Sequence, residues 1–533
     1  PKSTDGVTQK AFEIIGWDDG SETSEPEGVN VPGAVENLEI DIVGDEVQVT
    51  WDAPTTGAAV THYRIHQNPT TVVPSTQTSH TFAKVASPAS YAVTVHANSA
   101  EGAGEAMTVT LSTGSYRTIY GTVVDPILDT SGKVLDYDGP NLSIGANLMK
   151  VNLKDADLFE AALSGANLID ADLTRVNLTD ADLSGALMPL VNLTGANLTK
   201  AFVVSTFLNG ADLTDAEFWD AVTSNSDLTG ANLTGALLSD TDLRNIRSGG
   251  ITFDGTPPTL PTDWQLIDGY LIGPTANLRY MGLDEMNLSG ANLSGANFLY
   301  AELTGANLTK ADLSGATLTG ANLYGADLSD VRSGGITNRT QYVERPLILP
   351  TDWQLIDGYL VGPGADLTGA DLTSADLTGA TLTDVRSGGI TYNGTPPILP
   401  TDWQLIDGYL VGPGANLTGA DLTGANLTNA DLTNVKSGGI TFDGTPPPLP
   451  TDWQLIDGYL IGPTADLTDA DLTGADLSGV DLSGVDLSGA TLSNVKSGGI
   501  TGDGSTTLPT NWQLIDGYLI GPGADLTDAD LNE

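Results

Sequence analysis

The sequence predicts an all-β protein in two parts, a small β-sandwich followed by a long repetitive solenoid. Leucine recurs every five residues through much of the chain after about Asn147. Apolar and polar residues alternate between Val31 and about Leu111, which is typical of half-buried strands. The chain has 63 glycines and only 6% aromatic residues, a composition that favours a thin, repetitive core over one large globular core.

The charge of the chain is strongly negative. Its 68 acidic and 20 basic residues give a formal net charge of −48, which repels phosphate and excludes nucleic-acid binding through a basic groove. Such acidity favours solubility in a salty medium where self-repulsion is screened. Cysteine is absent, so disulfides, thiolate nucleophiles and cysteine metal sites are excluded. No apolar run approaches the roughly 18–20 residues that span a bilayer, so we expect no membrane insertion.

The repeating unit reads A-(D/N)-L-(T/S)-(G/D/N). A period of five fits neither a helix nor a plain strand, but it fits a coil that turns a corner every five residues. The central leucine and the alanine two residues before it then point inward, while Asp/Asn and Thr/Ser face water. Gly, Asp or Asn closes each unit, and these residues tolerate the backbone geometry of a corner.

This unit resembles the pentapeptide-repeat family, and the resemblance covers about residues 141–533. It implies a right-handed quadrilateral β-helix with four units, or twenty residues, in each coil. The leucine slots fall into six blocks, at residues 148–243, 278–328, 367–382, 417–432, 467–492 and 526–531.

Five longer cassettes separate the blocks. Each begins SGGIT, at Ser248, Ser333, Ser387, Ser437 and Ser497, and contains LPT(D/N)WQLIDGYL(I/V)GP. Two apolar runs around an Asp-Gly pair predict a two-residue hairpin. A cassette usually adds thirty residues, so we expect a protruding hairpin of about ten and one further coil of twenty. This arithmetic predicts Trp353, Trp403 and Trp453 on one face and shifts Trp512 by half a turn.

Residues 31–113 resemble a fibronectin type III domain. The resemblance rests on Trp51 in an early strand, Tyr63 in the next, and the stretch beginning Tyr91-Ala-Val-Thr-Val. Before this domain we expect an N-terminal segment with an acidic linker at 1–30. After it we expect a connector at 114–140 that caps the first coil. The first β-helix block then covers 141–247, and the cassette-interrupted blocks cover 248–533.

The search for chemistry favours a protein that is not an enzyme. All four histidines, His62, His66, His80 and His96, lie in the sandwich region and lack a convincing third metal ligand, so the repeats can form no Ser-His-Asp arrangement from this chain. The many carboxylates occupy outward repeat slots, where a flat wall offers no pocket to shift a pKa. We therefore predict no catalytic residue, no metal site and no cofactor.

The cassette aromatics are the candidate contacts for a partner, because aromatic residues are enriched at interfaces. The alternative, which we favour, is that each tryptophan packs down to seal its hairpin against the coil. The candidates are Trp264, Tyr270, Trp353, Tyr359, Trp403, Tyr409, Trp453, Tyr459, Trp512 and Tyr518.

The function expected from these features is a structural or adhesive rod on a virion or cell surface, which contacts copies of itself, other structural proteins or surface glycans. The resemblance also implies an alternative, a DNA mimic that binds a type II topoisomerase. A second alternative is a carbohydrate-binding or carbohydrate-cleaving tailspike. The start at Pro1 suggests trimming, and the last half coil, with Leu526 and Leu531, suggests either end-to-end stacking or a natural chain that continues.

Overall fold

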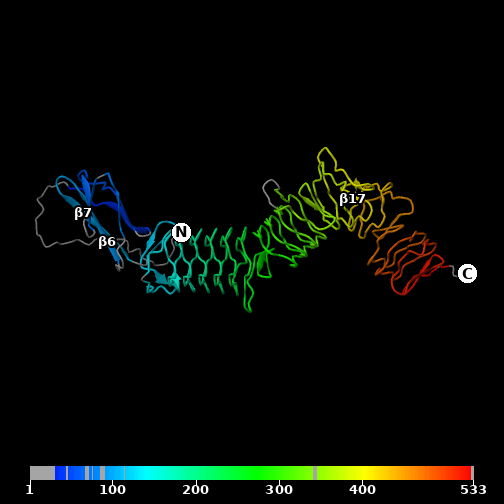
Figure 1. Cartoon of the computed structure of the whole chain (residues 1–533), viewed down its shortest axis with the longest axis horizontal. Coiled ribbons are helices and arrows are strands. Elements are labelled where there is room, and N and C mark those ends of the chain that lie inside the picture. The colour runs from blue at the N-terminus through cyan, green and yellow to red at the C-terminus, as the bar shows by residue number, and fades with distance from the viewer. Residues whose placement is uncertain are drawn as a thin grey trace. The chain divides into compact units, whose positions relative to one another are not determined.

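The structure, a computed structural model, describes residues 31–43, 46–66, 71–74, 76–83, 90–112, 115–137, 139–339, 345–527 and 529. The chain divides into two units, Pro1–Thr262 and Asp263–Glu533. Figure 1 shows the sandwich strands and a regular stack of coils in the first unit, and further coils with hairpins in the second. Within the described ranges, no helix is long and apolar enough to cross a membrane. The all-β prediction is confirmed.

Residues 31–112 form a sandwich of two antiparallel sheets. The three-stranded sheet has the order β1-β2-β5, from Glu36–Val43, Glu46–Asp52 and Ser79–Ala83. The four-stranded sheet has the order β4-β3-β6-β7, from Thr71–Pro74, His62–His66, Ser90–Asn98 and Ala103–Ser112. Trp51 on β2 and Tyr63 on β3 meet edge to face in the core, with ring centroids 5.3 Å apart. The predicted roles of these two residues are confirmed.

The connector contributes short strands that pair at the start of the first coil. Short strands β8 (Tyr116–Arg117) and β9 (Val123–Val124) pair with each other. Strand β10 (Leu128–Asp129) pairs antiparallel with β11 (Ala156–Asp157) of the first coil. These pairs give hydrogen-bond partners to strand edges that would otherwise be open at this end of the solenoid.

The coils of the first unit have a twenty-residue period. Parallel bridges join each residue of an outward column to the residue twenty positions later, for example Asn147 to Asn167 and Asn152 to Asp172. Leucines at the five-residue positions and the alanines before them are buried, including Leu148, Leu153 and Ala166. Four sides of five residues therefore surround an apolar axis, and the quadrilateral prediction is confirmed.

The last residue of most five-residue units forms the corner with a left-handed backbone. The φ angle is +66° at Gly165, +59° at Asp170 and +57° at Lys200. The outward Asp or Asn stabilises the same turn, because its side-chain oxygen accepts a hydrogen bond from the amide two residues later. In one such turn, the Thr174 amide donates to Asp172 Oδ1 over 3.0 Å. The repeat consensus therefore encodes both the corner and the cap of each turn.

The second unit contains five antiparallel hairpins between or beside coils. Their strands are β12 (Gln265–Ile267) with β13 (Tyr270–Ile272), β14 (Gln354–Ile356) with β15 (Tyr359–Val361), β16 (Gln404–Ile406) with β17 (Tyr409–Val411), β18 (Gln454–Ile456) with β19 (Tyr459–Ile461), and β20 (Gln513–Ile515) with β21 (Tyr518–Ile520). The Asp-Gly pair forms every turn, with both residues at positive φ in the hairpin of Asp357 and Gly358.

Cassette hairpins as the candidate functional site

Each cassette tryptophan lies against the glycine of its own Leu-(Ile/Val)-Gly-Pro motif. A Cβ built on Gly362 would lie 2.4 Å from Cδ2 of Trp353, and a Cβ on Gly412 would lie 2.4 Å from Cδ2 of Trp403. The same contact recurs for Trp264 on Gly273, Trp453 on Gly462 and Trp512 on Gly521. The packing interpretation of the tryptophans is thus confirmed, while their contact with a partner stays a prediction.

Each cassette tyrosine is also engaged within the chain. A Cβ on Gly334, the first glycine of the SGGIT motif, would lie 2.9 Å from Cε1 of Tyr359. The hydroxyl of Tyr359 accepts a hydrogen bond from the Asp371 amide over 3.0 Å. Tyr409 and Tyr459 make the equivalent bonds to Asp421 and Asp471, Tyr270 donates to the Gly282 carbonyl, and Tyr518 lies against Gly498.

The SGGIT motif is the docking site of the hairpin, a role that the sequence did not reveal. The Leu360 amide donates to Ser333 Oγ over 2.9 Å, and both residues are buried. The Ile336 amide donates to the Gly358 carbonyl at the hairpin turn over 3.0 Å. Corresponding pairs hold the later hairpins, with Ser387, Ser437 and Ser497 accepting from Leu410, Leu460 and Leu519.

The hairpins contribute to the core, so the prediction of a protruding hairpin of about ten residues is wrong for its second strand. Leu360 and Val361 on β15 are fully buried. Leu360 belongs to the core around residues 272–336, whereas Val361 belongs to the core of the next block. The first strand is less buried: Gln354 is exposed, while Leu355 and Ile356 are half-buried and pack against the cores.

The register of the cassettes follows the predicted arithmetic. Ladder bridges advance by twenty residues through an ordinary coil, as from Asn416 to Lys436, and by thirty where a cassette intervenes, as from Lys436 to Asp466. Trp353, Trp403 and Trp453 each lie thirteen residues before a member of this ladder, namely Asp366, Asn416 and Asp466. The three tryptophans therefore share a face, as predicted. Trp512 instead relates to the ladder of Asp476, Lys496 and Asp525, half a turn further round, also as predicted.

The remaining candidate residues are the two leucines of the last half coil and the histidines of the sandwich. Leu526 is half-buried, while Leu531 lies outside the described residues, so end stacking stays a prediction. The rings of His66 and His96 meet at 4.9 Å, and His62 contacts the hydroxyl of Thr61. The described part of the chain contains no group of three side chains able to hold a metal ion.

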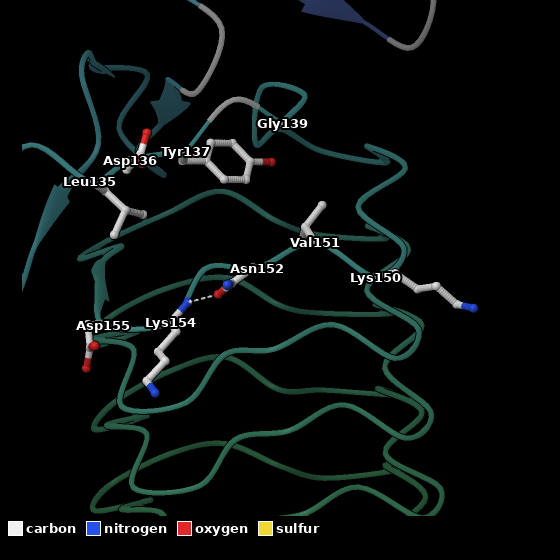
Figure 2. A pocket seen from close by; sticks show the side chains of 9 residues that line it. All are labelled: Leu135, Asp136, Tyr137, Gly139, Lys150, Val151, Asn152, Lys154 and Asp155. Atoms are coloured by element: carbon white, nitrogen blue, oxygen red, sulfur yellow. Dashed lines mark hydrogen bonds between the residues drawn. The ribbon is translucent and has the colours of Figure 1, made fainter.

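A hollow of about 500 Å³ lies between the connector and the first coil. It is lined by Leu135, Asp136, Tyr137, Gly139, Lys150, Val151, Asn152, Lys154 and Asp155. Figure 2 shows that these side chains do not converge, since Lys150 and Asp155 point away on opposite sides of the coil. The Tyr137 hydroxyl is already bonded to the Pro140 carbonyl over 2.8 Å. The arrangement offers no paired acid and base aimed at a common point.

Several carboxylates of the coils have pKa values lowered by the hydrogen bonds of their own turns. The Thr423 hydroxyl and amide both donate to Asp421 and lower the pKa of that carboxyl. Asp371, Asp471 and Asp503 have lowered pKa values for the same reason. A general acid requires the opposite shift, so these groups act as turn caps and as surface charge.

One further surface was missed at the sequence level. In the first unit, apolar residues replace Asp or Asn at several outward positions, and Leu187, Phe202, Phe207 and Leu237 are exposed there. The signal was present, because each of these residues breaks the consensus at a slot that the period assigns to the surface.

Comparison with known families agrees with this geometry. Eight copies of the family described as pentapeptide repeats match residues 152–195, 192–222, 208–245, 276–309, 300–332, 363–386, 413–436 and 465–496. The fibronectin type III domain family matches residues 33–113. No curated protein gave a significant match.

Solved structures of pentapeptide-repeat proteins are similar to parts of the chain. Rfr23 of the cyanobacterium Cyanothece 51142 has 27% identity, with 22% of this chain and 89% of Rfr23 covered, and a TM-score of 0.17. HetL of Nostoc sp. strain PCC 7120, involved in heterocyst differentiation regulation, has 27% identity, with 52% and 88% covered, and a TM-score of 0.13. Full-length QnrB1, a plasmid-mediated fluoroquinolone resistance protein, has 18% identity, with 33% and 86% covered, and a TM-score of 0.18. These TM-scores carry no inference about function.

Proposed function

Because the chain contains a pentapeptide-repeat region and a fibronectin type III domain, we propose that it is a non-enzymatic structural or adhesive element on a virion or cell surface. Its partners in this role are copies of itself or other structural proteins, which it contacts end to end or side by side. Surface glycans are a further class of partner.

The observation that carries the proposal is the way the cassettes join neighbouring blocks. In the second unit, β15 places Leu360 in one apolar core and the adjacent Val361 in the next. The hairpin of β16 and β17 does the same with Leu410 and Val411. These two cassettes therefore link the coils on their two sides. This arrangement supports a stiff scaffold whose outer surface is free to make contacts.

The surface chemistry supports the same role. Capped carboxylates line the coils and keep them charged and hydrated, which favours solubility in a medium of moderate or high salt. The histidines that a triad or a general base would use lie only before residue 97. A fibronectin type III sandwich placed ahead of a repetitive solenoid is consistent with a spacer that presents or anchors other modules.

The location of the protein tests the proposal directly. Quantitative mass spectrometry of purified virions, cell envelope and cytosol from the source should find the chain in a surface or virion fraction. A supercoiling assay with a type II topoisomerase should show no inhibition at micromolar chain concentration. Recovery only from cytosol, together with inhibition of supercoiling, would overturn the proposal in favour of the DNA-mimic alternative. Cleavage of a surface polysaccharide would favour the tailspike alternative.

A further inference from the structure

One side of the first-unit coils differs from the other three in what it shows to solvent. We call it face A and define it by the outward column Asn147, Asn167, Leu187, Phe207, Asp227 and Arg247, whose members are joined by parallel bridges. The column rises in five coil steps, about 24 Å at about 4.8 Å a step. Its surface is a flat parallel ladder of the kind that packs against other flat sheets.

Face A is apolar at its centre. Leu187 is 39% exposed and Phe207 is 47% exposed, one coil apart in the same column. Leu190, at the corner of this side, is 62% exposed and lies on Gly210 of the next coil. Phe202 extends the apolar surface around the neighbouring edge. A cluster of large apolar side chains in outward slots marks a contact surface.

Face A is also electrically balanced, although the whole chain carries −48. Its charged groups form two ion pairs, Lys150 with Asp170 and Arg247 with Asp227, each with a nitrogen-to-oxygen distance of 3.7 Å. The side that begins at residue 156 is very different. It carries Asp157, Glu160, Asp180, Glu217, Asp220 and Asp240 against the single cation Lys200.

We propose that face A pairs with face A of a second copy, side by side and antiparallel, about a two-fold axis between Leu187 and Phe207. This inference rests on the proposed structural function and specifies its homotypic contact. Balanced charge favours a second copy as the occupant, because face A does not repel itself, whereas the strongly acidic side that begins at residue 156 would repel its own copy. A basic partner, by contrast, would bind an acidic side and gain nothing from face A.

The two-fold arrangement matches the order of residues along the column. Leu187 meets the partner subunit's Phe207, and Asn167 meets the partner subunit's Asp227, so no carboxylate faces another carboxylate. Because face A is only about 24 Å long and one coil side wide, we expect the contact to bury less than the roughly 800 Å² per partner of a standard stable interface. The dimer is therefore reversible and depends on concentration.

Sedimentation equilibrium of the full chain over a concentration series tests this pairing. Wild type should show a monomer–dimer equilibrium that strengthens from low to moderate salt, as the repulsion between the two acidic chains is screened. The double variant Leu187→Asn and Phe207→Asp should weaken dimerisation at least tenfold. Both new residues match neighbours in the same column, Asn167 and Asp227, so the coil accepts them. The matched control, Leu237→Asn, removes an apolar side chain of 45% exposure from another side and should leave dimerisation unchanged.

A crosslink gives a second readout that depends on register. The chain has no cysteine, so Asn167→Cys and Asp227→Cys variants can be mixed and oxidised. They should form a heterodimeric disulfide faster than either variant alone.

A chain that stays monomeric at about 1 mM, the weak end of the affinity scale, overturns the pairing. So does a dimer that the double variant leaves intact, or one that salt dissociates. None of these three results alters the proposed structural function, which is decided by the location of the protein and by the supercoiling assay.

Discussion

The indole ring of Trp353 lies directly on Gly362, nine residues further along the chain and just after the second strand of the same hairpin. A Cβ at residue 362 would lie 2.4 Å from the indole Cδ2. Real side chains do not approach this closely, so glycine is required by space and not by backbone angle. The contact lets the ring pack at once against the block before the cassette and the block after it.

Substitution Gly362→Ala should displace the Trp353 ring and loosen the β14–β15 hairpin. Overpacking of this kind costs about 1–3 kcal/mol. Hydrogen exchange should show faster amide exchange at Leu360 and Val361. Gly282→Ala is the control, because the nearest atom to its added Cβ would be 3.9 Å away. Unchanged exchange in Gly362→Ala would contradict the contact.

Substitution Ser387→Ala should weaken the docking of the next hairpin. Ser387 Oγ accepts the hydrogen bond of the Leu410 amide over 2.9 Å at a buried position. Loss of the acceptor leaves a buried N–H unsatisfied, at a cost of about 1–3 kcal/mol. The Leu410 amide should exchange about tenfold faster or more. Ser329→Ala removes an exposed hydroxyl that bonds to Asp327 and should have little effect at its own site. Equal effects of the two variants would argue against the role of Ser387.

Much of the fold could be predicted because its signals are local. The five-residue period alone assigns Leu148 and its successors to the core, and the consensus Gly or Asp to the corners. Alternation in the first hundred residues predicts the strands that bring Trp51 and Tyr63 together. The thirty-residue cassette insertion predicts the shared face of the three tryptophans, because register in a ladder depends only on counting.

The remaining features depend on contacts that sequence spacing does not specify. Ser387 and Leu410 are separated by 23 residues, and only closure of the enlarged coil brings the hydroxyl to the amide. The apolar centre of face A was missed because Leu187 and Phe207 lie twenty residues apart and each looks like an isolated departure from the consensus. Burial of the second hairpin strand was also missed, since a hairpin signal does not say which strand enters the core.

The capped aspartates should make stability depend on pH in the acidic range. The Thr423 hydroxyl and amide lower the pKa of Asp421 below the unfolded value of about 3.9. The unfolded chain therefore binds the proton more readily, so the stabilisation is complete above about pH 4 and is lost as pH falls through the folded pKa. Thermal unfolding followed by circular dichroism from pH 7 to pH 2 should show the loss at the acidic end.

Substitution Asp421→Asn isolates this contribution. Asn426 accepts the equivalent bonds from Thr428, so asparagine can keep the turn without a titrating group. The variant should lose less stability than wild type between pH 4 and pH 2. Thr423→Val, which removes the hydroxyl donor, should raise the Asp421 pKa toward its ordinary value. Identical pH profiles for all three proteins would exclude the cap as a source of the dependence.

The sandwich should lose stability nearer neutral pH through His96. Burial lowers the pKa of its imidazole most, the hydrogen bond with the Gly104 carbonyl offsets part of this, and the nearby His66 and Arg64 lower the pKa further. The unfolded chain, with a histidine pKa of about 6.5, then binds more protons than the folded chain. Stability is therefore complete above about pH 6.5 and falls as pH drops below that value.

Nuclear magnetic resonance can follow the titration, since the chain has only four histidines. His96 should titrate below pH 6.5, and His96→Gln should flatten the loss of sandwich stability between pH 7 and pH 5. Titration of His96 at or above pH 6.5 would show that its ring is solvated and that this packing is wrong.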